Sequence, residues 1–372
     1  MLDCCCRNTG LNRCFVGKSK MPESKTAKGT ITAAAARAGS INILFTCIGR
    51  RVSLLNTFRT AAQKLRIKAA FFGTDITELS PALQLCDKRF LVKPISHPKY
   101  IKELLQIVKQ NKVSLLVPTI DTDLLVLAKH KADFANLGCR ALVSDPDVIE
   151  ICQDKRKTYR FLLKNGFDTP ATMSFRTALA KKKLNWPCFM KPWDGYASRG
   201  TAVVKNRSEL LFFAKRIPNP IVQDFVEGTE HTCDVYVDFS MDVRCVVPRK
   251  RIEIRSGEVS KGQVVKNRQL MLLGADLVKV LGAGPGVITL QCFVQKDGRI
   301  KVTEINPRFG GGVPLAIKAG ANFPKWIIGE LLCSRVDSLG RTRQLDRHIN
   351  VSFDGFSDGL IMLRYDDEVW MG

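Results

Sequence analysis

The chain has 372 residues, of which 45% are hydrophobic, so it is long enough to form two or three domains with buried cores. It contains no apolar run of eighteen residues, which argues against a membrane-spanning helix. The formal net charge of +23 is compatible with nucleic acid, with anionic small molecules or with a solvated basic surface. Because no five basic residues are consecutive and no RNA-binding or zinc-finger motif is present, the charge alone does not favour nucleic acid.

Residues 1–39 differ from the rest of the chain. They are basic, small and polar, they hold four of the thirteen cysteines, and they lack the apolar stretch of a signal peptide. We expect a disordered tail, either an organelle transit peptide or an extension upstream of a start at Met21. The other nine cysteines are scattered singly through apolar segments without a CxxC pair, which favours reduced thiols in a cytoplasmic protein.

Between residues 40 and 150, apolar strands alternate with amphipathic helices. This alternation predicts a parallel sheet with helices on both faces. Asp75 and Asp121 follow two of the strands at the sheet edge where ligands bind, although capping or turn formation is the alternative for each. The predicted strands are 41–51, 67–75, 114–123 and 139–145, and the predicted helices are 52–65, 100–112 and 124–138.

The first strand is not followed by a dinucleotide-binding fingerprint. The segment TCIGRR at 46–51 has one glycine where three are expected, so a nicotinamide cofactor is poorly supported. Arg50 and Arg51 start the next helix and are placed to hold an anion.

A second unit begins at 151. The segment DKRKTYRFLLKNG predicts a helix with Asp154 as N-cap and with Tyr159, Leu162 and Leu163 on one face. The pattern then becomes mostly β, apart from a long helix at 268–282.

A β-hairpin is predicted at 291–307 (QCFVQKDGRIKVTEINP), with a two-residue Asp-Gly turn at 297–298. Counting back from this turn places Gln291 opposite Glu304. Asn306, two residues further on, shares the face of Glu304. Three oxygen donors thus converge on one patch, and Mg²⁺ is bound in proteins by a few such oxygens together with nucleotide phosphates.

Two weaker signals lie upstream of the hairpin. At 189–205, a strand brings Lys191 to a loop of small residues whose N–H groups could cover phosphates, although a plain hairpin turn is the alternative. At 221–234, an apolar strand bends at Gly228 before Glu230. Its edge could offer backbone groups to an adenine ring and its carboxylate could accept ribose hydroxyls, whereas an ordinary polar turn is the alternative.

The order and spacing of these segments resemble the ATP-grasp superfamily over about residues 41–335. PTIDTDLLVLA, QDKRKTY and EINPRFGGG make the chain similar to short relatives of the carbamoyl phosphate synthase large subunit and to the carboxylate–amine ligase of pyrrolysine biosynthesis. The resemblance implies an α/β and α+β fold: a Rossmann-like domain at 40–150, then a two-subdomain ATP-grasp domain at 151–345 with a lid at about 185–227. A C-terminal extension at 346–372 would pack on the ATP-grasp domain.

The resemblance also implies residue roles. Lys155 and Lys191 would approach the ATP phosphates, and Arg308 would steady the γ-phosphoryl group, so Lys191 and Arg308 are the expected catalytic residues. The metal ligands, for Mg²⁺ (or Mn²⁺), would be Gln291, Glu304 and Asn306. The other ATP-binding residues would be Gly195, Ser198 and Gly200 in the phosphate loop, Gln223, Asp224, Phe225 and Val226 at adenine, and Glu230 at the ribose. Gln223 and Gln291 replace acids found in many relatives, and we expect neither change to disable the site.

The implied activity is an ATP-dependent ligation in which a carboxylate is activated as an acyl phosphate and joined to an amine or ammonia. Asp121 and Arg255 are the candidate substrate residues, and Arg249 and Arg251 lie on the same segment as Arg255, although a solvated strand face is the alternative there. The alternatives are an ATP-binding protein without turnover and, less favoured, a basic nucleic-acid binder. We expect small-molecule partners and no membrane, and a homodimer is left open.

Overall fold

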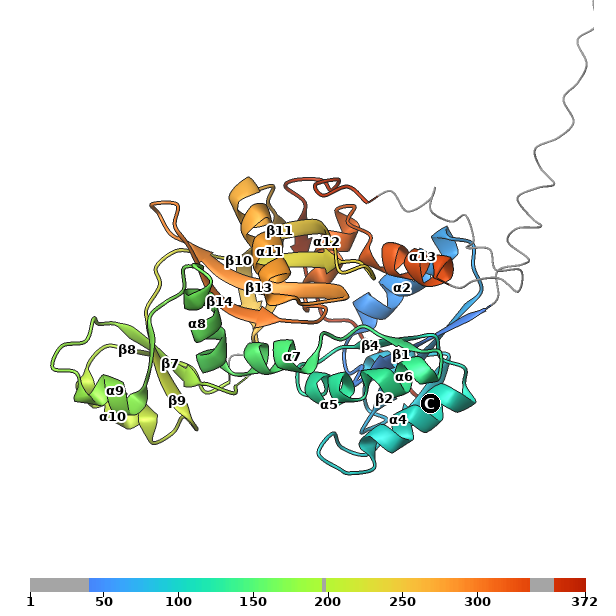
Figure 1. Cartoon of the computed structure of the whole chain (residues 1–372), viewed down its shortest axis with the longest axis horizontal. Helices are drawn as coiled ribbons and strands as arrows, with labels where there is room; N and C mark the ends of the chain where they lie inside the picture. Colours follow the sequence, from blue (N-terminus) through green and yellow to red (C-terminus); the bar gives the residue numbers. More distant parts are fainter. Residues whose placement is uncertain (1–39, 196–198, 335–350) are drawn as a thin grey trace, which may run out of the picture. The chain divides into compact units, whose positions relative to one another are not determined.

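A computed structural model describes residues 40–195, 199–334 and 351–372 (Figure 1). The predicted tail at 1–39 lies outside these residues. Within them the strands form three sheets. None of the helices in these ranges is both long and apolar enough to cross a membrane.

The first sheet is parallel and has the strand order β3-β2-β1-β4-β5, so the predicted parallel sheet is confirmed. Its strands are β1 Ile41–Thr46, β2 Ala69–Asp75, β3 Lys88–Leu91, β4 Leu115–Pro118 and β5 Arg140–Ala141. Its helices are α2 Val52–Lys64, α3 Pro81–Gln84, α4 Tyr100–Gln110, α5 Leu124–Lys129, α6 Lys131–Asn136 and α7 Pro146–Gln153.

The central strand β1 is buried on both faces, as a parallel strand between two helical layers must be. Ile43 and Phe45 belong to the core that includes α2, whereas Leu44 belongs to a separate core that includes α4. The predicted helix at 124–138 is wrong in one respect, because the chain forms α5 and α6 instead. His130 separates them with φ −111° and ψ 16°, which lies outside the helical region and ends α5.

A second, antiparallel sheet has the order β6-β9-β7-β8, with α9 and α10 beside it (Figure 1). It starts at Thr172, earlier than residue 185, where we expected the lid to begin. Its elements are β6 Thr172–Ser174, α9 Phe175–Ala180, β7 Cys188–Pro192, β8 Ala202–Val204, α10 Arg207–Ala214 and β9 Pro220–Asp224.

Helix α8 (Lys155–Lys164) precedes this sheet and begins as predicted. The side chain of its N-cap, Asp154, accepts a hydrogen bond from the backbone N–H of Arg156 at 2.9 Å. Leu162 is buried, but Leu163 is 52% exposed. Tyr159, Leu162 and Leu163 fall within an arc of about 100° around the helix, as predicted, but Leu163 lies at the exposed edge of that face.

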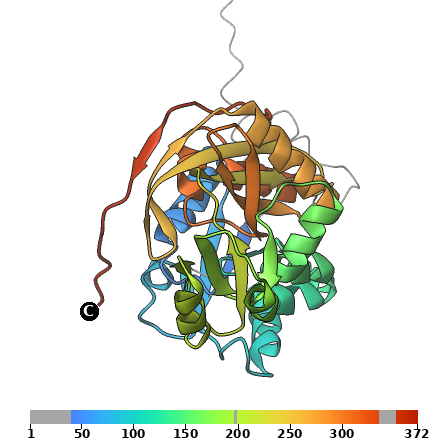
Figure 2. The ribbon, with the colours of Figure 1, turned by 90° about the vertical axis from the view of Figure 1, so that its left-hand side faces the viewer.

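The third sheet has the order β14-β13-β10-β11-β12-β15 and is antiparallel throughout. Its strands are β10 Thr229–Val237, β11 Val243–Arg255, β12 Glu258–Val264, β13 Gly286–Val294, β14 Ile300–Asn306 and β15 Ile361–Leu363. The helices of this region are α11 Arg268–Leu281, α12 Val313–Lys318 and α13 Phe323–Cys333. Figure 2 shows the short β15 in red along the outer edge of the sheet, near the C-terminus.

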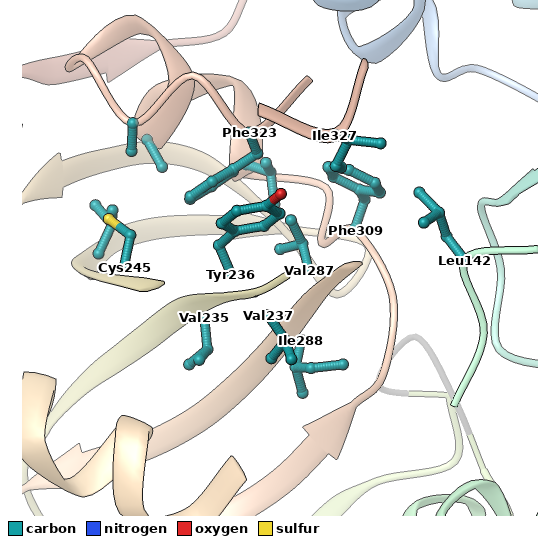
Figure 3. Close-up of a cluster of buried hydrophobic side chains, with 14 of the residues drawn as sticks. Leu142, Val235, Tyr236, Val237, Cys245, Val287, Ile288, Phe309, Phe323 and Ile327 are labelled. Atoms are coloured by element: carbon teal, nitrogen blue, oxygen red, sulfur yellow. The ribbon is translucent and has the colours of Figure 1, made fainter. Parts of the chain in front are cut away.

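The two faces of this sheet have different surroundings. Val235 and Val237 point to one side of β10, and Tyr236 points to the other, toward Phe323 (Figure 3). Helix α11 packs on β10 and β11. The Tyr236 side is apolar where α13 covers it, and it becomes polar toward the start of β10. That polar part is the floor of the candidate site.

The predicted pairing of Gln291 with Glu304 is confirmed, but the predicted two-residue turn is wrong. The backbone N–H of Gln295 donates to the carbonyl of Arg299 at 2.9 Å, so three residues form the loop. A register shift between Gln291 and Cys292, which leaves Thr303 as an extra residue on β14, then restores the expected pair. The two departures from the predicted hairpin cancel at Gln291.

The buried carboxylate of Asp123 is expected to make the stability of the first domain depend on pH. It is fully buried, accepts a hydrogen bond from Thr46 Oγ1 at 2.6 Å, and has no partner for Oδ1 among the described residues. Burial raises the pKa of Asp123 to about 7. The unfolded chain therefore binds fewer protons than the folded one between about pH 4 and pH 7, and stability falls as pH rises through that window.

We predict that Asp123→Asn, which cannot ionise, becomes more stable relative to the wild type by roughly 2 kcal/mol when the pH rises from 5 to 8. Urea unfolding at both pH values measures the difference. An unchanged difference between the two proteins would contradict the assignment.

Candidate active site

The candidate site is built on the polar part of the third sheet. Strand alternation places Glu230, Thr232 and Asp234 of β10 on one face. Two rows of paired residues cross this face: Arg249, Thr232, Gln291 and Glu304 in one, and Val247, Asp234, Thr289 and Asn306 in the next. Residues far apart in sequence thus become neighbours because antiparallel pairing fixes each row.

Three cavities border this face and share Glu304. The first, of about 320 Å³, is lined by Lys155, Lys191, Gly195, Gln223, Asp224, Phe225, Val226, Glu230, Arg251, Gln291 and Glu304, among others. The second, of about 310 Å³, is lined by Arg51, Asp121, Thr232, Arg249, Arg251, Glu258, Gln291, Glu304, Asn306, Arg308 and residues 310–312, among others. The third, of about 430 Å³, reaches from Asp121 and Asn306 to Lys155 and Gly195.

Gln291, Glu304 and Asn306 are brought together on this floor, and all three line the second cavity. Within the described ranges, no hydrogen bond or ion pair engages the side chain of any of them. No group of three His, Cys, Asp or Glu residues in these ranges could hold a metal. A divalent ion here would therefore depend on one carboxylate, two amide oxygens and ligand oxygens, which suits Mg²⁺.

Lys191 reaches the first cavity from β7. Its side chain is buried, and the described residues offer it no carboxylate within ion-pairing distance. Burial lowers the pKa of Lys191 to about 8, although Glu304 partly offsets this effect. A buried ammonium without a bound counter-ion is costly, so this position favours an anionic ligand.

The predicted phosphate loop is only partly described. Lys155 Nζ donates to the carbonyl of Gly195, and both residues line the first cavity. Gly200 has φ +64°, lies at the exposed end of the loop, and is not among the cavity-lining residues. Ser198 lies outside the described residues.

The predicted hinge lies where β9 ends at the first cavity. Gln223 is buried and donates from Nε2 to Thr172 Oγ1 at 2.6 Å, so its side chain ties β9 to β6. Asp224, Phe225 and Val226 line the cavity beside it. Glu230 lies in the same cavity and pairs with Arg251 Nη1 at 2.9 Å; burial raises its pKa, while Arg251 opposes this effect.

Arg308 and Asp121 meet across the second cavity. Arg308 Nη2 donates to Asp121 Oδ2 at 2.5 Å, and the Nε of Arg308 has no partner among the described residues. Asp121 belongs to the loop after β4, so the first domain contributes directly to the site. Asp75, the other acid named from the sequence, accepts hydrogen bonds from the N–H groups of Gly49 and Ile76 and serves the turn instead.

An ion pair that the sequence did not reveal lies under the second cavity. Asp234 is fully buried and Arg249 is 1% exposed. Asp234 accepts from Arg249 Nε at 2.6 Å and from Arg249 Nη2 at 2.9 Å, and Thr289 Oγ1 donates to Asp234 at 3.3 Å. Asp234 is one of two acids in the segment TCDVYVDF, and its position inside an apolar strand in phase with Glu230 is the only sequence signal for it.

The backbone of the glycines at 310–312 lies close to the side chains of Thr289, Glu258 and Arg249. A Cβ on Gly310 would lie 2.9 Å from Thr289, and one on Gly311 would lie 2.8 Å from Glu258. A Cβ on Gly312 would lie 2.2 Å from Arg249 Nη1. These three glycines therefore make room for side chains of the protein.

Glu258 is a second residue that sequence reasoning missed. It pairs with Arg51 at 3.0 Å and with Arg364 at 3.1 Å, and Arg364 also donates to the carbonyl of Gly311. Although burial alone would raise it, the pKa of Glu258 is lowered by Arg51, Arg50 and Arg364. The first domain and the segment after β15 thus meet at one carboxylate.

Arg255 lies apart from the three cavities. It is at the end of β11, its side chain is 63% exposed, and it pairs with Glu253 at 3.1 Å. Arg249 and Arg251, on the same strand, line the second cavity instead. Register shifts around Glu253 interrupt the regular alternation between these positions.

The fold and the cavities together define an ATP-grasp domain preceded by a Rossmann-like domain. Residues 43–142 match the family model of the PylC-like, N-terminal domain, and residues 152–312 match that of the ATP-grasp domain. The chain is a member of the ATP-grasp superfamily, with a PylC-like domain ahead of its nucleotide-binding fold.

Individual relatives are distant. The chain is 22% identical over 263 residues to the carbamoyl phosphate synthase large chain of Thermoplasma acidophilum, which covers 64% of this chain and 25% of that protein. It therefore spans about a quarter of the length of that relative.

Solved structures share the fold. The L-amino acid ligase from Bacillus licheniformis aligns with a TM-score of 0.61 and 21% identity, over 78% of this chain and 74% of that chain. The N5-carboxyaminoimidazole synthetase from Staphylococcus aureus complexed with ADP aligns with a TM-score of 0.62 and 16% identity, over 78% and 77%. At these identities the likeness shows the fold alone.

The buried pair predicts an asymmetric mutational response. Asp234→Asn leaves the Arg249 charge buried without a counter-ion, and we expect a loss of roughly 3–5 kcal/mol in the free energy of unfolding. The double variant Asp234→Asn/Arg249→Met removes both charges and should recover most of that loss. Denaturant unfolding of the three proteins measures the effect.

The control is Asp168→Asn, which breaks the more exposed pair with Lys301. We expect it to cost at most about 1 kcal/mol. If the double variant is as unstable as Asp234→Asn, the loss of stability does not come from an unpaired Arg249 charge, and the prediction is wrong.

Proposed function

We propose that the protein is an ATP-dependent carboxylate–amine ligase, which activates a carboxylate as an acyl phosphate with Mg·ATP and joins it to an amine or ammonia. The observation that carries the proposal is the buried Lys191 without a carboxylate partner, facing the same cavity as Glu304. A cation and an anion that come from two different sheets, line one cavity and have no ion-pair partner among the described residues suit a ligand that is itself a phosphate–metal complex.

In this proposal the first cavity takes the nucleotide. Lys191 and Lys155 contact its phosphates, the backbone at 224–226 contacts adenine, and Glu230 contacts the ribose after release from Arg251. Gln291, Glu304 and Asn306 hold Mg²⁺, which would neutralise charge on the phosphate oxygens. The unengaged side chains of these three residues in the described structure are the reason they suit a metal.

The second cavity then takes the substrate carboxylate. One of its oxygens attacks the γ-phosphorus, the bond to the β–γ bridging oxygen breaks, and ADP leaves. Arg308, which already lies over the floor through Asp121, would neutralise charge on the transferred group. The amine then attacks the acyl carbon and phosphate leaves. Such chemistry depends on positioning and charge, so no side-chain nucleophile is required.

We predict that Glu304→Gln and Lys191→Met each lower the rate of ADP formation by at least about a hundredfold, because each removes a charge that the transition state needs. The readout is ADP release across a panel of carboxylates and amines. Lys250→Met, an exposed change on β11, is the matched control. Near-normal turnover in either site variant would refute the assigned roles, and nucleotide binding without turnover by the wild type would favour a non-catalytic ATP-binding protein.

The depressed pKa of Lys191 predicts a pH effect on nucleotide binding. Phosphate contact requires the protonated amine, whose pKa in the free protein is about 8. Affinity for Mg·ADP should therefore fall by up to tenfold per unit as pH rises above about 8. Calorimetry between pH 7 and 9.5 measures this slope.

Lys191→Arg, which keeps its charge across that range, should bind Mg·ADP with an affinity that changes little with pH. An equally steep slope in this variant would mean that another group is responsible.

A further inference from the structure

The second cavity has more arginine than its proposed role at the γ-phosphate needs. Four arginines line it (Arg51, Arg249, Arg251 and Arg308), and three carboxylates line it (Asp121, Glu258 and Glu304). Each of the four arginines has a carboxylate partner: Glu258 for Arg51, Asp121 for Arg308, Asp234 for Arg249 and Glu230 for Arg251. Three of them still carry a buried donor without a partner among the described residues, namely Arg249 Nη1, Arg251 Nε and Arg308 Nε. Buried donors of this kind favour an anionic occupant.

Arg249 lines this cavity and has one hydrogen-bond donor without a partner among the described residues. Its Nε and Nη2 are held by Asp234, so the plane of the guanidinium is fixed. Its Nη1 has no partner among the described residues, although only 1% of Arg249 is exposed. Nη1 lies toward Gly312 and Val259, which both line the second cavity.

A buried N–H group without an acceptor is costly, and proteins usually satisfy such groups. An anionic ligand oxygen in the second cavity would satisfy Nη1. The fixed orientation of the guanidinium would also reduce the entropy lost when the ligand binds. Gly312 makes room for the guanidinium in this orientation, because a Cβ there would lie 2.2 Å from Nη1.

An anion bound at Arg249 would lie some distance from the group that reacts near Glu304. Arg249 and Glu304 belong to the same row of the sheet, with Thr232 and Gln291 between them. Three strand spacings of roughly 4.8 Å put their backbones about 14 Å apart. A small molecule that reacts near Glu304 can therefore extend toward Arg249, and a cavity of about 310 Å³ holds a molecule of this size.

We propose that the second cavity contains an anion subsite in which Arg249 binds a carboxylate other than the one that is activated, so that one of the two substrates is a dicarboxylate or an amino acid. Arg249 contacts this carboxylate through Nη1, and Asp234 is a positioning residue that orients the guanidinium. The inference rests on the proposed function only for what happens at the reacting end of the substrate.

The test uses the full chain and a defined probe pair. Succinate carries two carboxylates, and succinamide has the same shape without charge. With the protein saturated by Mg²⁺ and a non-hydrolysable ATP analogue, Lys191 and Arg308 are occupied by phosphate. Titration calorimetry then measures the Kd of each probe. We expect succinate to bind at least tenfold more tightly than succinamide, since hydrogen bonds to charged groups are the stronger ones.

The variants separate the subsite from general damage. Asp234→Asn/Arg249→Met removes the pair without leaving a buried charge, and the ratio of the two Kd values should fall to about one. Lys250→Met, the exposed neighbour on β11, should keep the wild-type ratio. Asp234→Asn alone should lower the ratio while Arg249 is still present. A purely structural role would weaken both probes alike and leave the ratio unchanged.

Three results would overturn the proposal: equal binding of the two probes to the wild type, no binding of succinate, or an unchanged ratio in the double variant. Binding of inorganic phosphate in place of succinate would assign the subsite to a phosphate and would also overturn it. The affinity for the ATP analogue is measured first, so that a failure of the proposed function can be distinguished from a failure of the anion subsite. If the analogue does not bind, the proposed function fails, and the same probe titration on the nucleotide-free protein still decides the subsite.

Discussion

The structure depends on keeping charge buried on one face of an antiparallel sheet whose other face packs against helix α11. Asp234 and Arg249 lie in the interior, where each charge loses its hydration, so the carboxylate depends on hydrogen bonds from its neighbours. Arg249 supplies two of these bonds and Thr289 is placed to supply a third, while Arg249 Nη1 has no partner among the described residues. The glycines at 310–312 fit the same arrangement, because a Cβ at these positions would clash with Thr289, Glu258 or Arg249 where these side chains now lie.

The pairing of charges also indicates where ligands belong. Glu230, Asp121 and Glu258 each have an arginine within 3.5 Å, so these groups are neutralised within the protein. Lys191 and Glu304 have no such partner among the described residues, and they face the cavity that we assign to the nucleotide. The groups that the fold leaves unpaired are those that a phosphate–metal complex would engage, and this contrast links packing to the proposed chemistry.

The Rossmann-like domain takes part in the site as well as preceding it. Asp121 follows β4 and contacts Arg308, while Arg51 is the N-cap residue of α2 and contacts Glu258. Helix α2 also packs against α12 and α13, which follow the glycines. Substrate choice in this superfamily member is therefore expected to depend on residues of both domains.

Short-range rules were enough to predict some features from the sequence. Alternating strands and helices predicted the parallel sheet, and Asp154 could be identified as an N-cap. The pairing of Gln291 with Glu304 was counted from a two-residue turn that the structure does not have. Features that depend on pairing between residues far apart in the sequence could be seen only in the tertiary structure. The bulge at Thr303 compensated for a longer turn, and the register shifts near Glu253 separated Arg255 from Arg249 and Arg251. The partners of Asp234 and Glu258 come from other strands and from the other domain, so no local pattern encodes them: a buried charge is recognised only when the residue that neutralises it is known.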